Sequence, residues 1–305
     1  MPVSPQRYEL LRKRLDRFTR MLQSEGDDDV RALHRTRVAS RRLREVLPLL
    51  ELDGELTSKL GRRLRKVTER SGTVRELDVL LLVIDELRRA GRYPDAALTR
   101  VAASVLEQRG RARARLMAKA PVDELGRLAR KLEKIARVLE AQDAAARGRR
   151  NQPRSLEWAI DARIARRAST VSAALSAAGA LYLPDRLHAG RIAVKKLRYA
   201  MEMSADIAHL KSTPDLEQLV HVQDILGRLH DLQVLVDRVR KVQASLTRPD
   251  VVAWRELDRL VVSIEDDCRR LHGRYMHERD ALASLCTRLS GRGPEVRSQK
   301  AKVRS

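Results

Sequence analysis

Two short motifs occur twice along the chain, in the same order and at nearly the same distance, and this near-repeat strongly constrains the fold. HRTRVASRRLR begins at His34 and is echoed by HAGRIAVKKLR at His188, 154 residues later. SGTVRELDVL begins at Ser71 and is echoed by LGRLHDLQVL at Leu226, 155 residues later. Repetition on this scale indicates an internal duplication. We therefore expect two similar halves with pseudo-twofold symmetry, joined at the polar, basic linker RGRRNQP of residues 147–153.

The residues around the motifs favour helices. Aromatic residues make up only 3% of the chain, and the apolar residues needed for a core must be Leu, Val and Ala. Together with abundant Arg and Glu, these are strong helix formers. No run alternates apolar and polar residues with the period of two that strands require. The sequence predicts an all-α protein with two four-helix-type bundles, at 1–150 and 151–290, and a disordered basic tail at 291–305.

Turn residues divide each half into helices. Ser4 and Pro5 are typical of a helix start, as N-cap and first helical residue. The first expected helix runs from there to about residue 22. The other expected helices span about residues 28–50, 55–70, 74–90, 95–119, 121–147, 155–179, 185–208, 215–242 and 250–289. A kink is expected at Gly227, inside the ninth of them.

The first motif of each half places its cations on one side of a helix. At 100° per residue, a quarter turn holds four residues in each half, namely His34, Arg37, Arg41 and Arg44, and then His188, Arg191, Lys195 and Arg198. Stacked like charges destabilise a helix by tenths of a kcal/mol per pair, a cost that a regularly spaced anion would offset. Arginine adds bidentate hydrogen bonds to phosphate, while Lys195 and Lys196 act as point charges. The pattern favours a row of phosphates over a single carboxylate.

The second motif pairs a glycine with a donor and an acid. Gly72 and Gly227 would permit close backbone approach near a helix start, where anions bind readily. Arg75 in the first half and His230 in the second are the candidate donors. The acids either orient neighbouring arginines or simply favour the helix N-terminus; they are Glu76, Asp78 and Asp231.

Other basic and histidine residues receive different interpretations. Arg62 and Lys66 share a face and are expected to extend the basic surface. The remaining histidines are interpreted as structural; they are His209, His221, His272 and His277.

The net charge of +22 and a pI near 10.9 point to a polyanionic partner, which could be nucleic acid, anionic lipid or inorganic polyphosphate. Arginine enrichment of a GC-rich genome would explain part of the excess. The sequence has no signal-peptide pattern and no apolar run long enough for a membrane span, so a cytoplasmic protein is expected. Cys268 and Cys286 lack metal-type spacing, and no metal site, disulfide or cofactor is expected.

The four motifs resemble the CHAD family, the conserved histidine α-helical domain, over roughly Gln6 to Leu289. The resemblance implies two pseudo-symmetric four-helix bundles with a basic surface between them that binds inorganic polyphosphate, and an association with polyphosphate granules. Carried over by position, the family's histidines fall on His34 and His188. Its basic helix residues fall on Arg37, Arg41, Arg42, Arg44, Arg191, Lys195, Lys196 and Arg198, followed by Tyr199.

The sequence departs from the family pattern in two ways. The usual Arg-Asp pair is Arg75-Glu76 here, and the ExExK motif of the CYTH-type triphosphate tunnel domain is missing. We therefore expect a stand-alone CHAD protein without the hydrolytic chemistry of the tunnel domain.

Two further classes of function compete with polyphosphate binding. A general polyanion or nucleic-acid-binding, nucleoid-type protein is equally compatible with the charge, although no helix-turn-helix, zinc or ribonucleoprotein signature is present and aromatic residues are few. An enzyme acting on polyphosphate with Mg²⁺ would need clustered carboxylates. The nearest cluster, Glu265 to Asp267, lies in a helix whose side chains point in different directions. The sequence therefore predicts a binding protein that is not an enzyme.

Overall fold

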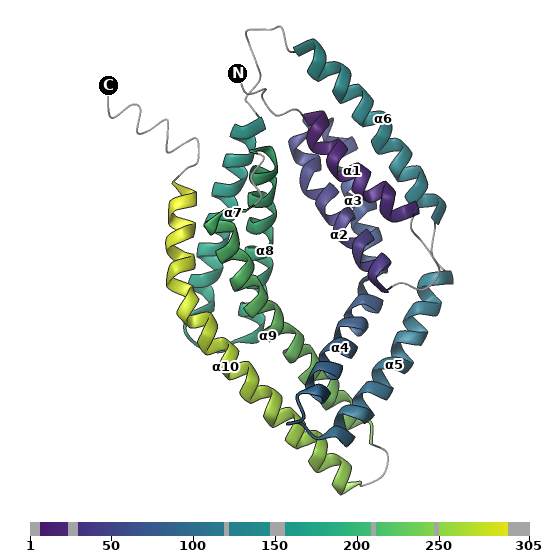
Figure 1. Cartoon of the computed structure of the whole chain (residues 1–305), viewed down its shortest axis with the longest axis vertical. Helices are drawn as coiled ribbons and strands as arrows, with labels where there is room; N and C mark the ends of the chain where they lie inside the picture. Colours follow the sequence, from purple (N-terminus) through teal and green to yellow (C-terminus); the bar gives the residue numbers. More distant parts are fainter. Residues whose placement is uncertain are drawn as a thin grey trace.

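The computed structural model describes residues 7–23, 30–118, 122–146, 156–208, 212–246 and 250–291, without the side chains of 22–23, 30–34, 117, 122–124 and 146. These residues form α-helices and one 3-10 turn, and no strand occurs among them, so the prediction of an all-α fold is confirmed (Figure 1). The elements are α1 (Arg7–Gln23), α2 (Val30–Val46), η1 (Leu47–Leu49), α3 (Gly54–Arg70), α4 (Gly72–Arg89), α5 (Asp95–Ala118), α6 (Val122–Ala146), α7 (Leu156–Ala178), α8 (Pro184–Ile207), α9 (Pro214–Ala244) and α10 (Val251–Ser290).

Local chemistry sets several of the helix ends. The side chains of Asp53, Thr213 and Asp250 each accept a hydrogen bond from a backbone amide three residues later, as N-cap residues do. Gly179 follows the last residue of α7 with φ of 62°, a conformation that favours glycine at a helix end. Through Gly227, where a kink was expected, α9 is one continuous helix. The predicted start at Ser4-Pro5, the linker at 147–153 and the tail beyond 291 lie outside the described residues.

The apolar faces of the helices form two cores. The first lies among α1, α2, α3, α6, α7 and α8, the beginning of α9 and the end of α10, and it buries Phe18, Leu43 and Leu197. The second lies among α4, α5, the end of α9 and the beginning of α10, and it buries Leu80 and Val236. In Figure 1, α4 and α5 accordingly lie beside the lower parts of α9 and α10. Each core thus contains residues from both sides of the boundary predicted near residue 150, and the duplication itself stays a prediction.

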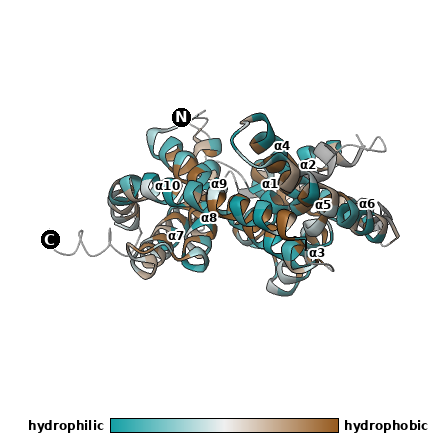
Figure 2. Ribbon diagram, turned by 90° about the horizontal axis from the view of Figure 1, so that it is seen from below, coloured by the Kyte–Doolittle hydropathy of each residue, from teal (hydrophilic) through white to brown (hydrophobic). Residues whose placement is uncertain are grey.

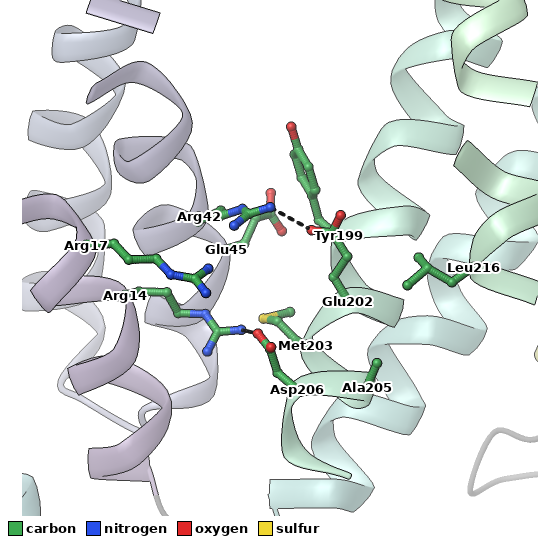
Figure 3. A pocket seen from close by; sticks show the side chains of 10 residues that line it. All are labelled: Arg14, Arg17, Arg42, Glu45, Tyr199, Glu202, Met203, Ala205, Asp206 and Leu216. Carbon is green, nitrogen blue, oxygen red and sulfur yellow. Dashed lines mark hydrogen bonds and ion pairs between the residues drawn. The ribbon is translucent and has the colours of Figure 1, made fainter. Parts of the chain in front are cut away.

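Seen along the long axis, α7 to α10 gather on one side and α1 to α6 on the other (Figure 2). Charged contacts join the two sides where α1 and α2 face α8. Lys13 and Arg14 of α1 both bind Asp206 of α8, at 2.7 Å each. Arg42 of α2 binds Glu202 of α8 at 3.4 Å. These pairs border a groove of about 280 Å³ between the two sides (Figure 3).

Two further observations bear on the sequence predictions. Cys268 and Cys286 are buried free thiols, in the second and first core respectively. Among the helices described, none combines the length and the apolar character that crossing a membrane requires.

Candidate anion-binding site

Basic side chains from four helices influence one another electrostatically where α2 faces α8. We call this set the cationic cluster; its members are Arg37 and Arg41 of α2, Arg75 of α4, His188, Arg191 and Lys195 of α8, and His230 of α9. Arg41 connects the two sides, because its charge lowers the pKa values of Arg37 on its own helix and of Arg191 and Lys195 on α8. The structure thus brings together cations from both predicted halves.

Arg37 is held at the junction of α3 and α4. Its guanidinium donates hydrogen bonds to the carbonyl oxygen of Thr68 and, at 3.2 Å, to the hydroxyl of the buried Ser71. It also lies 3.6 Å from the place that a Cβ on Gly72 would occupy. Burial, with the charges of Arg41 and Arg75, lowers the pKa of Arg37 to about 10. The side chain is therefore fixed in direction within a region of positive potential.

Arg191 has a similar relation to α9. Its Nε lies 3.9 Å from the place that a Cβ on Gly227 would occupy, and that nitrogen is buried without a hydrogen-bond partner among the described residues. Burial lowers the pKa of Arg191, the charge of Asp231 opposes that effect, and Arg41 adds to it. At each glycine the neighbour is the arginine of the preceding motif, at a distance of ordinary van der Waals contact. The close approach of an anion to the two glycines stays a prediction.

Lys195 is partly buried and surrounded by other cations. Burial lowers its pKa to about 8, and the surrounding positive charges contribute further; they belong to Arg41, Arg191, Lys196 and Arg198. A lysine with this pKa is partly neutral at slightly alkaline pH, because burial and the neighbouring cations disfavour its positive charge.

The two histidines of the cluster contact each other. The Nδ1 atoms of His188 and His230 are 3.2 Å apart, so one ring donates a hydrogen bond and the other accepts it. Burial, followed by the charge of Arg191, lowers both pKa values, and that of His230 falls to about 4. Both rings are therefore largely neutral near neutral pH in the protein without a ligand.

Acids are scarce in the cluster. Asp231 faces it, and burial raises its pKa although Arg191, Arg228 and Arg75 act in the opposite direction. Asp78 was a candidate partner for the adjacent arginine, but its carboxylate accepts a hydrogen bond from Arg109 of α5 at 2.6 Å. Because Asp78 is buried against α5, its role is to hold α4 and α5 together. Glu76 is exposed on α4.

Four predicted residues border the cluster on α2 and α8. Arg42 and Arg198 both bind Glu202, at 3.4 and 2.7 Å. The buried Tyr199 of α8 accepts a hydrogen bond from Arg41 of α2 at 3.2 Å. Lys196 is exposed beside Lys195. This region is therefore continuous with the cluster, although Glu202 partly neutralises its charge.

Of the other four predicted residues, the three with described side chains lie outside the cluster. Arg44 is half-buried and has no ion pair with a residue in the described ranges. Arg62 and Lys66 are exposed on α3, more than a quarter turn from Thr68, which faces α2. The backbone of His34 belongs to α2, but its side chain lies outside the described residues. The roles predicted for these four residues stay predictions.

The sequence analysis did not predict the ion pairs of the two acids, Glu45 and Glu202, that follow the rows of cations on α2 and α8. Glu45 accepts hydrogen bonds from Arg163 and Arg167 of α7, and Glu202 accepts them from Arg42 and Arg198. The spacing of Arg198 and Glu202, four residues apart on a helix, could have indicated the second pairing. The partners of Glu45 come from another helix more than a hundred residues away and leave no local signal.

The carboxylates considered for metal chemistry face different cations. Glu265 binds Arg240, Asp266 binds Arg269, and Asp267 binds Arg92, Arg270 and the hydroxyl of Tyr93. Within the described ranges, no group of three or more His, Cys, Asp or Glu residues could hold a metal ion.

Comparison with known proteins identifies one family. A family model described as CHAD domain matches residues 9–240. The fold is similar to the crystal structure of the CHAD domain from the plant Ricinus communis, with a TM-score of 0.59 and 19% identity over 94% of this chain and 93% of that one. It is also similar to PptA from Streptomyces chartreusis, with a TM-score of 0.56 and 18% identity over 94% of this chain and 99% of that one. No curated protein matches the sequence.

Proposed function

The chain belongs to the CHAD domain family, and we propose that it binds inorganic polyphosphate at the cationic cluster. The family is associated with polyphosphate binding in general. The observation that carries the proposal for this chain is the convergence of arginine, lysine and histidine side chains from α2, α4, α8 and α9 on one surface that Asp231 faces.

The lowered pKa values give the physical reason for binding an anion. Burial and the neighbouring positive charges disfavour the charged forms of Arg37, Arg191 and Lys195. A chain of phosphates relieves this repulsion, and it does so at several cations at once. Arginine also offers phosphate two parallel hydrogen bonds, which are stronger when both groups are charged.

The packing of the arginines supports tight binding. Arg37 is fixed by Thr68 and Ser71, and Arg191 is packed over Gly227. Side chains that are already held in place lose little conformational entropy when a ligand binds. The function we propose is therefore binding without catalysis, and a protein that binds the polymer in this way would collect on polyphosphate granules.

A variant of four residues tests the proposal. Changing Arg37, Arg41, Arg191 and Lys195 to Ala should weaken binding of long-chain polyphosphate at least about a hundredfold at moderate salt, because each charged contact contributes about 1.5 kcal/mol or more. The slope of log affinity against log salt should fall by about 3, using the value for single-stranded polyanions. A control variant loses the same charge from exposed positions, namely Lys241, Arg255, Arg259 and Arg274. Wild-type affinity in the folded cluster variant would refute the proposal.

The net charge of +22 favours a second candidate, a general polyanion or nucleic-acid-binding protein. Long-chain polyphosphate and duplex DNA should be made to compete at matched phosphate concentration. Clear preference for polyphosphate supports the first proposal, and comparable affinity for both supports the second. Chain-length analysis of polyphosphate after incubation with the protein and Mg²⁺ tests the absence of catalysis.

A further inference from the structure

The outer face of α6 carries a second row of cations. Its members are Arg127, Arg130, Lys131, Lys134 and Arg137, which lie within about a third of the helix circumference. The opposite face contributes Leu128, Leu132 and Leu139 to the first core. Because α6 packs against α1 at the edge of the molecule, this row lies away from the surface where α2 faces α8 (Figure 1).

Three members of the row keep their charge without an acidic partner among the described side chains. Arg130, Lys134 and Arg137 are exposed, and none of them has an ion pair with a residue whose side chain is described. Of the nearest acids, Glu133 is bound by Arg12 of α1, and Glu140 is exposed beyond the end of the row. On α10, by contrast, Arg269 and Arg270 each bind an aspartate three residues before them.

The arrangement has a cost that the free protein does not offset. Residues three and four apart on a helix are neighbours, and a like-charged pair at this spacing destabilises the helix by a few tenths of a kcal/mol. Such pairs recur along α6, for example between Arg130 and Lys134 and between Lys134 and Arg137. A ligand with regularly spaced negative charges would remove this repulsion.

We propose that the outer face of α6 binds a second stretch of polyphosphate, so that one protein molecule links two chains or two parts of one chain. The inference rests on the proposed function of the cationic cluster. The row is narrow and its cations follow one another about 5 Å apart along the axis, which fits a single linear phosphate chain. Its apolar members are Val138 and Ala141, so it offers no aromatic ring on which a base could stack.

The test removes three cations from the row. The variant Arg130→Ala, Lys134→Ala, Arg137→Ala is compared with a control that loses Arg255, Arg259 and Arg274 from exposed positions on α10. Tripolyphosphate is too short to join the cluster and the row, so its binding to the cluster should be the same in both variants and the wild type. With long-chain polyphosphate, the α6 variant should lose about 2 from its log–log salt slope and should bind at least about tenfold more weakly than the control. Light scattering should show that the α6 variant no longer links polyphosphate chains into large assemblies, whereas the control does.

Other outcomes overturn the inference. An α6 variant that behaves like the control with long chains, in slope and in scattering, shows that the row is only a solvated face. A variant that keeps its affinity for long chains but loses binding of duplex DNA assigns the row to nucleic acid instead. Failure of the proposed function is recognised separately, because it appears as wild-type affinity in the variant of the cationic cluster.

Discussion

Binding of polyphosphate should weaken as the pH rises from 7 to 9, and Lys195 should account for most of the change. In the free protein the pKa of Lys195 is about 8, below its ordinary 10.5, because of burial and the charges of Arg41, Arg191, Lys196 and Arg198. The amine is then roughly nine-tenths protonated at pH 7 and one-tenth protonated at pH 9. A bound phosphate chain favours the charged form, so the complex keeps the proton and the free protein loses it.

The size of the effect follows from this difference. If the complex stays protonated throughout, the affinity falls about tenfold between pH 7 and pH 9. Solvent screening of the partly exposed amine reduces the effect, and we expect a fall of about threefold to tenfold. Isothermal titration calorimetry in buffers of different ionisation enthalpy should also detect the uptake of a fraction of a proton on binding at pH 8. His188 and His230 have lowered pKa values and add to the affinity only at acidic pH.

Variants of Lys195 separate this effect from ionisation of the ligand. Lys195→Gln should bind more weakly at pH 7 with a flatter profile, and Lys195→Arg should retain affinity at pH 9 because arginine stays charged. The stability of the free protein should move in the opposite direction. Between about pH 8 and 10.5 the unfolded chain binds more protons at this position than the folded one, so the free energy of unfolding rises with pH. Identical profiles for the wild type and Lys195→Gln would refute the reasoning.

Two further substitutions test particular contacts. Glu202→Gln should raise the affinity for polyphosphate a few-fold. The carboxylate of Glu202 forms ion pairs with the guanidinium groups of Arg42 and Arg198 and therefore competes with phosphate for them. Unchanged or weaker binding in a filter or calorimetric assay would contradict this. Asp267→Asn should lower the free energy of unfolding by about 1–3 kcal/mol in urea titrations, because the buried carboxylate accepts hydrogen bonds from Arg92, Tyr93 and Arg270. Its affinity for polyphosphate should stay at the wild-type value, since Asp267 lies in the second core, away from the cluster, and a marked loss of binding would show that the two regions are coupled.

The helices could be predicted because their determinants are local. Apolar periodicity and capping residues such as Asp53 and Asp250 act within a few residues, so the expected ranges agree with the observed ones to within a few positions. The two copies of the second motif also differ in structure for a local reason. Ser71 lies between α3 and α4 and binds back to Val67, whereas Leu226 at the corresponding position is a buried core residue of α9.

The arrangement of the helices could not be predicted in the same way. Nothing near Leu80 or Leu98 indicates that α4 and α5 pack against α9 and α10, whose residues lie well over a hundred positions further along the chain. Helical spacing was enough to predict the rows of cations on α2 and α8. Their pairing across a groove depends on the tertiary fold, as does the contact between His188 and His230.

The two long helices that pass through both cores make the halves of the molecule mutually dependent. An isolated segment comprising α1 to α6 would lack the surfaces of α9 and α10, and residues such as Leu77, Leu80 and Val83 would be left facing water. An isolated segment comprising α7 to α10 would likewise expose Val236 and Leu260 to water. If the chain arose by duplication, neither half now contains a complete core of its own. The candidate site, which takes residues from both halves, therefore forms only in the intact chain.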